Sequence, residues 1–114
     1  MTIIRNFNGQ ILLRFDGDYI KDFGGSIKYK ISGNSVKDFY GRTLYVIGND
    51  NVKDFCGRTL LNISSDTCKD FGGRILARFD SKIIKNFYGV TEYRIEGYLS
   101  KTEIMALLAI CYAN

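Results

Sequence analysis

Hydrophobic and polar residues alternate along most of the chain in short runs. The run "RTLYVI" at residues 42–47 is typical of a short strand, since it is rich in β-branched and aromatic residues. Gly, Asp, Asn and Ser residues interrupt these runs every few positions and favour tight turns. The pattern therefore predicts an all-β fold made of many short strands.

The same sixteen-residue pattern occurs six times without an insertion or deletion. The repeats begin at Ile4, Ile20, Val36, Val52, Cys68 and Ile84. In every repeat position two is basic, position three is Asp or Asn, position four is Phe and position six is Gly. Such internal repetition indicates that one supersecondary unit is used six times.

Each repeat predicts a β-hairpin. Asp-Phe-x-Gly is typical of a type I turn in which the Gly has a positive φ and forms a bulge. Positions three and seven then face each other, where opposite charges attract. The pairs Asp38–Arg42, Asp54–Arg58 and Asp70–Arg74 fit this register. A second turn, such as "DGD" at residues 16–18, leads to the next repeat, so six hairpins give twelve strands.

The alternation stops after residue 99, and residues 100–114 predict a helix. Ser100 and Glu103 have the spacing of a capping box. Apolar residues then recur with a helical period, and they are Ile104, Leu107, Leu108 and Cys111. This helix is very apolar and needs to be covered.

Twelve strands and an apolar helix can form an open meander or a closed barrel. An open sheet leaves two bare edges, which proteins usually avoid. Twelve strands spaced by ~4.8 Å and tilted by ~40° enclose a cylinder about 24 Å across, with room for a helix. We expect a single domain, residues 1–114, in which a closed twelve-stranded antiparallel barrel surrounds the C-terminal helix; an open array is the alternative.

Regular pairing beyond the turn predicts which strand positions face the helix. Positions eight, ten and twelve would point inward, and positions one and nine would pair on the outer wall. The residues of this predicted outer stripe are Ile4, Leu12, Val36, Leu44, Val52, Leu60 and Leu76, with Cys68 opposite Leu76. Exposed aliphatic pairs could support self-association or a partner protein, or long charged side chains could cover them.

The hairpin count, the apolar terminal helix and the Asp-Phe-x-Gly-Arg repeat resemble the tubby C-terminal-like architecture and the shallow bacterial barrels called β-flowers. This resemblance spans nearly the whole chain and implies a ring of hairpins around a helix. Tubby-like domains include phosphoinositide binders, but no binding motif of theirs matches here, so no residue role is transferred. The Phe-x-Gly core is also similar to the Tyr-x-Gly of MORN repeats, which form open hairpin arrays with a longer period.

The basic residues at position two are the candidate ligand site. They are Arg5, Lys21, Lys37, Lys53, Lys69 and Lys85. In a closed barrel they would form a ring near one mouth, where like charges attract an anionic small molecule or lipid headgroup. Alternatively, each Lys lays its stem over apolar surface and keeps its ammonium in water. The six Phe residues at position four either pack at one end of the barrel or form an exposed aromatic fringe.

The composition argues against catalysis. The 114 residues include no His, so neither a Ser-His or Cys-His dyad nor a histidine metal site is available. We therefore predict no catalytic residues, no metal site and no cofactor. The three cysteines lack CxxC spacing, and we expect reduced thiols in a cytoplasmic protein. We also expect no leader before the first repeat.

The net charge of +4 is mild and does not require nucleic acid, which we do not expect as a partner. The sequence predicts a non-catalytic binding or scaffold protein that accepts an anionic ligand at one barrel mouth or self-associates through its wall. The alternative is a membrane-surface binder of anionic lipid headgroups. Neither the ligand nor the oligomeric state follows from the sequence.

Overall fold

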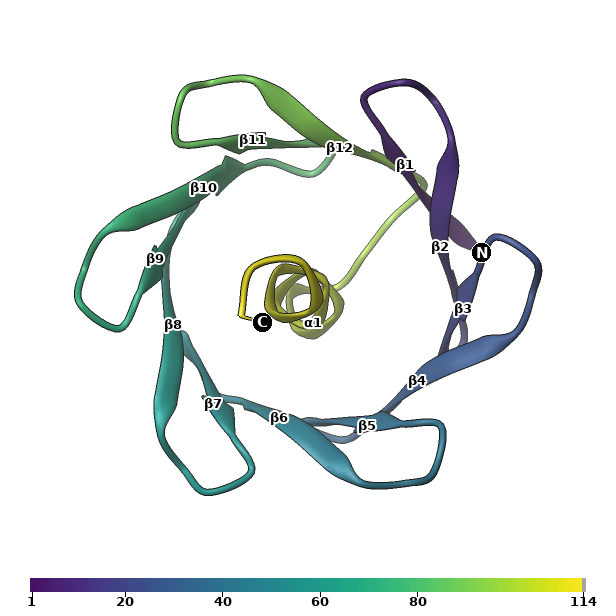
Figure 1. Ribbon diagram of the computed structural model, residues 1–114, viewed down its shortest axis with the longest axis horizontal. Helices are drawn as coiled ribbons and strands as arrows, with labels where there is room; N and C mark the ends of the chain where they lie inside the picture. The colour runs from purple at the N-terminus through teal and green to yellow at the C-terminus, as the bar shows by residue number, and fades with distance from the viewer. Residues whose placement is uncertain (114) are drawn as a thin grey trace.

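The computed structural model describes residues 1–113 and shows a closed antiparallel barrel of twelve strands around one helix (Figure 1). The strands are β1 (Thr2–Asn6), β2 (Ile11–Asp16), β3 (Tyr19–Asp22), β4 (Ile27–Ser32), β5 (Ser35–Asp38), β6 (Thr43–Ile47), β7 (Asn51–Asp54), β8 (Thr59–Ser64), β9 (Thr67–Asp70), β10 (Ile75–Phe79), β11 (Ile83–Asn86) and β12 (Thr91–Glu96). The helix α1 is Lys101–Tyr112, and residue 114 of the predicted helix lies outside the described residues. The predicted closed barrel is confirmed.

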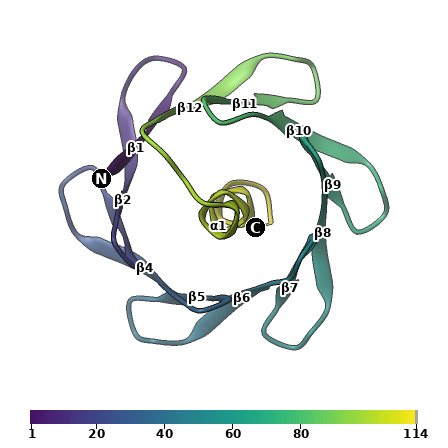
Figure 2. The same cartoon turned by 180° about the vertical axis from the view of Figure 1, so that it is seen from behind.

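The barrel closes because each strand pairs with its neighbours in sequence and β1 pairs with β12. All odd-numbered strands run in one direction, so the Asp-Phe-x-Gly turns of all six hairpins lie at the same end. We call the hairpins petals and this end the petal end; the second turns and the connection to α1 lie at the opposite end. Figures 1 and 2 show the petals projecting from a ring that surrounds α1. The molecule is a disk of 35 × 32 × 20 Å.

The petal turns have the predicted geometry. The Gly at position six has a φ between 82° and 91° in all six petals. Within Asp38, Oδ1 accepts hydrogen bonds from the backbone N–H groups of Tyr40 and Arg42, and Oδ2 lies 2.9 Å from Arg42 Nε. The corresponding ion pairs of Arg58 and Arg74 measure 3.3 Å each. The predicted pairing of positions three and seven is therefore confirmed.

A second bulge, at position nine, was not predicted. Position two pairs with position eight, as in Arg5 with Ile11, but position one pairs with position ten, as in Ile4 with Leu13. The same shift occurs in the other five petals. One extra residue in the even-numbered strand changes which side chains face inward, because the two faces of a strand alternate at every residue.

The bulge places position one inside the barrel. All six position-one side chains are 0% exposed, and they are Ile4, Ile20, Val36, Val52, Cys68 and Ile84. Positions ten and twelve line the core as predicted, whereas position eight does not belong to it. The predictions that position one lies on the outer wall and that position eight faces the helix are therefore wrong.

The predicted outer aliphatic stripe does not exist. Ile4, Val36 and Val52 are core residues, as stated above. Leu44, Leu60 and Leu76 are half-buried and pack against the core cluster. Of the seven predicted stripe residues, Leu12 is exposed, at 36%. The physical reason is the bulge, which moves the partner of position one by one residue.

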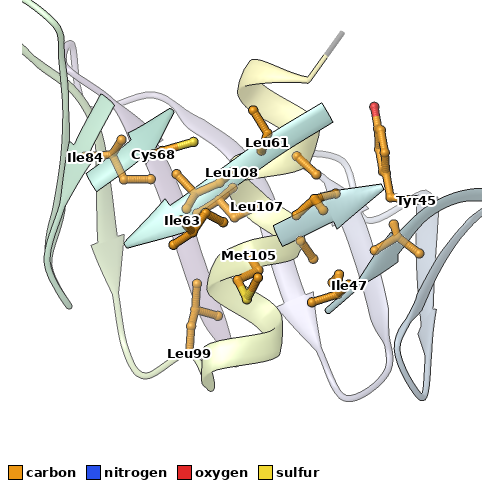
Figure 3. Packing of buried hydrophobic residues seen from close by; sticks show 14 of the residues in the cluster. Tyr45, Ile47, Leu61, Ile63, Cys68, Ile84, Leu99, Met105, Leu107 and Leu108 are labelled. Carbon is orange, nitrogen blue, oxygen red and sulfur yellow. The ribbon is translucent and has the colours of Figure 1, made fainter. Parts of the chain in front are cut away.

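The helix fills the barrel. Its N-terminus has the predicted capping box, in which Ser100 Oγ accepts from the Glu103 N–H and the Glu103 carboxylate accepts from the Ser100 N–H. Residues 105–109 are all 0–1% exposed, so burial surrounds the helix and is not limited to the predicted stripe. Figure 3 shows Met105, Leu107 and Leu108 among side chains of the barrel wall.

Within residues 1–113, no helix has the length and hydrophobicity required to cross a membrane.

Candidate binding site at the petal end

The six Phe residues of the petal turns are exposed. Their exposed fractions range from 61% for Phe87 to 79% for Phe71. The next residue adds a second exposed ring in two petals, where Phe39–Tyr40 and Phe87–Tyr88 stack edge to face with centroids 5.4 and 5.3 Å apart. Of the two arrangements open from the sequence, the structure shows the aromatic fringe and not packing at one end of the barrel.

Arginines lie beside these rings. The side chains of Arg42, Arg58 and Arg74 are 77–82% exposed, although each pairs with the Asp of its own turn. The guanidinium of Arg42 also lies 5.9 Å from the centroid of the Tyr40 ring, within the range of a cation–π contact. Three petals therefore present an aromatic ring and a guanidinium together.

The predicted basic ring forms, but it lies outside the barrel. Position two follows the buried position one, so its side chain points to the outer face of the strand. The pairs across the strands are Arg5–Arg94, Lys21–Arg14, Lys37–Lys30, Lys53–Val46, Lys69–Asn62 and Lys85–Arg78. The prediction that these six residues surround a mouth is wrong, because strand alternation turns them away from the interior.

Two of these basic residues have acidic partners. Lys21 Nζ lies 3.0 Å from Asp16 Oδ2, and Arg5 pairs with Glu96. Five of the six, all except Lys85, are half-buried. This partial burial fits the alternative given in the sequence analysis, in which the aliphatic part of each basic side chain covers apolar surface and its charged group stays in water. The outer wall is therefore basic around its circumference.

The mouth at the petal end is occupied by the end of α1. Tyr112 Oη donates a hydrogen bond of 2.6 Å to Glu92 Oε1, and the rings of Tyr112 and Tyr93 meet edge to face. Burial raises the pKa of the Cys111 thiol to about 12 and that of Cys68 to about 11. These thiols are protonated at neutral pH and are poor nucleophiles.

A groove separates the fifth and sixth petals beside this mouth. It has a volume of about 420 Å³ and is lined by Arg74, Ile75, Leu76, Asn86, Phe87, Tyr88, Glu92 and Tyr112. Glu92 was not among the site residues predicted from the sequence. Its contact with Tyr112 could not be foreseen, because Tyr112 belongs to the helix and reaches Glu92 only once the barrel is filled.

The opposite end is acidic. Its second turns and their flanks contain five Asp residues and one Lys, which are Asp16, Asp18, Asp50, Asp66, Asp80 and Lys82. Lys101, at the start of α1, lies 3.8 Å from Asp50. The two ends of the disk thus differ in charge as well as in aromatic content. No cluster of three or more Cys, Asp or Glu side chains within residues 1–113 could hold a metal ion.

Comparison of the chain with protein-family models, curated proteins and solved structures found no match.

Proposed function

We propose that the protein is a non-catalytic binder of anionic membrane surfaces and that the petal end is the face that contacts the lipid. The observation that carries this proposal is the fringe of six exposed Phe residues at one end of a disk. Nothing in the fold requires these rings, since they do not belong to the core cluster. Exposed apolar groups gathered on one face commonly mark an interaction surface.

A lipid surface suits the chemistry of this end. Phenylalanines can enter the boundary between headgroups and acyl chains, while neighbouring basic residues remain among the headgroups. Arg42, Arg58 and Arg74 lie at the petal tips, and the position-two residues lie on the outer wall behind them. Each basic residue near an anionic surface contributes about 1 kcal/mol, so several petals together can retain a small protein.

The charge difference between the two ends supports one orientation. The carboxylates of the second turns would be repelled by an anionic surface, whereas the basic residues of the outer wall would be attracted. The arginines of the petal tips are each paired with an Asp of the same turn, so they add little net charge. The petal end therefore approaches the membrane and the acidic end faces the solvent. The first prediction from the sequence, an anion in a mouth ringed by the position-two residues, loses its support because those residues point outward, and the present proposal develops the alternative.

Cosedimentation with vesicles tests the proposal. We expect the protein to pellet with phosphatidylglycerol–phosphatidylethanolamine vesicles at low salt and to be released at about 1 M salt, where the screening length falls to ~3 Å. Phe71→Ser should weaken partitioning by roughly five- to tenfold, because a ring that inserts is lost. Tyr98→Ser is the matched control, since Tyr98 is also 79% exposed but lies in the connection at the opposite end.

Two results would contradict the membrane function. One is a protein that stays in the supernatant with anionic vesicles at low salt. The other is equal weakening by Phe71→Ser and Tyr98→Ser, which would show that the petal end has no special role.

A further inference from the structure

The groove between the fifth and sixth petals combines three elements that lie far apart in sequence. The β9–β10 petal supplies Arg74, the β11–β12 petal supplies Phe87, Tyr88 and Glu92, and α1 supplies Tyr112. Its volume of about 420 Å³ is within the range of small-molecule sites, which runs from roughly 300 to 1,000 Å³.

The interior of this groove favours a cation. The rings of Phe87, Tyr88 and Tyr112 line it, and the faces of aromatic rings carry negative electrostatic potential. The Glu92 carboxylate adds a formal negative charge, and its hydrogen bond with Tyr112 keeps it in place. A small ion holds its hydration water strongly, and contact with aromatic rings does not compensate for losing that water. A quaternary ammonium group is large and weakly hydrated, so contact with aromatic rings can replace its hydration water.

The sequence breaks its repeat at this groove. Position nine is Leu in four repeats and Lys in the second, and it is Glu only in the sixth. The other petals can form a cleft between neighbours, but none of them can place a carboxylate at this position. The combination of an acid and three rings is therefore particular to the boundary of the fifth and sixth petals.

A group that can bind an anion also lines the groove. Arg74 is 80% exposed, and its Nε lies 3.3 Å from Asp70 Oδ2, which orients the guanidinium. A ligand that carries a phosphate next to a quaternary ammonium group could contact Arg74 and the aromatic rings together.

We propose that this groove binds a quaternary ammonium group, as in choline or phosphocholine. The ring faces and the Glu92 carboxylate hold the ammonium, and Arg74 holds an adjoining phosphate. The site does not rest on the membrane function, because a soluble choline compound and a choline lipid headgroup present the same chemistry.

Titration of the ¹⁵N-labelled protein with choline chloride tests the site, with sodium chloride at the same ionic strength as the reference. We expect saturable shifts of the amide signals of Phe87, Tyr88 and Glu92, and little change in the other petals. Glu92→Gln should weaken choline binding by about tenfold without unfolding the protein, since the amide oxygen still accepts from Tyr112.

Phe87→Ser and Phe55→Ser form a matched pair, because both rings occupy position four and are exposed, at 61% and 73%. We expect Phe87→Ser to weaken choline binding several-fold and Phe55→Ser to leave it unchanged. The proposal is overturned if choline produces no saturable shift, if shifts occur equally in all petals, or if the two variants behave alike.

Two further arms identify the source of the ligand and separate this proposal from the membrane function. Tighter binding of phosphocholine than of choline, lost in Arg74→Gln, supports the role of Arg74; equal binding overturns that role.

A preference for phosphatidylcholine over phosphatidylethanolamine at equal vesicle charge, abolished by Glu92→Gln, identifies a lipid headgroup. Binding of free choline without that preference identifies a soluble compound, and pelleting with anionic vesicles that contain no choline lipid tests only the membrane function.

Discussion

The two ends of the barrel are built from different turns. At the petal end, all six turns keep Asp or Asn, then Phe, then Gly at fixed positions. At the opposite end, the second turns vary, as in "DGD" at residues 16–18 and "GND" at residues 48–50. The contrast shows at which turn positions the backbone requires a particular residue and at which it does not.

Backbone angles explain much of this contrast. The petal glycines have φ values of 82–91°, beyond the left-handed region that other residues can enter. At the opposite end, Gly17 and Gly33 have φ values of 60° and 61°, and the fourth repeat has Ser65 there at 53°. A residue with a side chain is tolerated at that angle, so the second turns are free to differ. Turn geometry does not explain the invariant Phe, and for this reason the proposed membrane contact is built on it.

Removing the helix should destabilise the protein most, because α1 forms the centre of the hydrophobic core inside the barrel. A chain that ends at Leu99 should lose cooperative thermal unfolding and become molten or insoluble. Leu107→Ala should cost about 2–5 kcal/mol, since its side chain is 0% exposed. Lys101→Ala, at the exposed start of the helix, should change the free energy of unfolding by less than about 0.5 kcal/mol. A soluble truncated chain with a sharp melting transition would argue against this role of the helix.

Acid should weaken the petal end more than the opposite end. Backbone N–H donors, with Arg42, Arg58 and Arg74 adding to the effect, lower the pKa values of Asp38, Asp54 and Asp70 below the ordinary 3.8. When the pKa of a carboxyl group is lower in the folded protein than in the unfolded chain, the ionised group stabilises the fold above the unfolded-state pKa. This stabilisation disappears as the pH falls through the folded-state pKa. The melting temperature should therefore fall steeply below about pH 4.

The triple variant Asp38→Asn, Asp54→Asn and Asp70→Asn tests the origin of this acid sensitivity. Asn can keep the turn, because Asn6 Oδ1 accepts the same two backbone hydrogen bonds in the first petal. The variant should show a shallower decline of melting temperature below about pH 4. Asp80, at the opposite end, also has a lowered pKa and should account for part of what remains. Identical pH profiles would assign the acid sensitivity to groups outside the petal turns.

Substitution of a single glycine at the petal end should lower the stability less than removal of the helix or exposure to acid. Gly73 has a φ of 91°, so Gly73→Ala should cost about 1–2 kcal/mol in chemical denaturation. Gly72→Ala is the control next to it, because a Cβ at Gly72 would lie in ordinary contact with Asp70 Oδ1 at 3.4 Å. Four other petals have a residue with a side chain at that position, namely Asn8, Tyr40, Cys56 or Tyr88, so Gly72→Ala should be close to neutral. Equal effects of the two substitutions would contradict the geometric explanation of the invariant glycine.

The sequence alone determined the features that depend on residues close together in the chain. The six hairpins, the positive φ of the position-six glycines and the Asp–Arg pairs depend on residues within about five positions of one another. The capping box at Ser100 is equally local, and closure followed from the number of strands and the need to cover an apolar helix. Each of these features is confirmed.

Only the tertiary structure decided which strand faces point inward and which residues line the groove between the fifth and sixth petals. The bulge at position nine depends on how a short strand fits its neighbours around the helix, and one extra residue moved Ile4 and Val52 from the predicted wall into the core. The groove needs Arg74, Tyr88 and Tyr112, which come from two petals and the helix. No local pattern contains that arrangement, because packing the helix inside the closed ring is what brings these residues together.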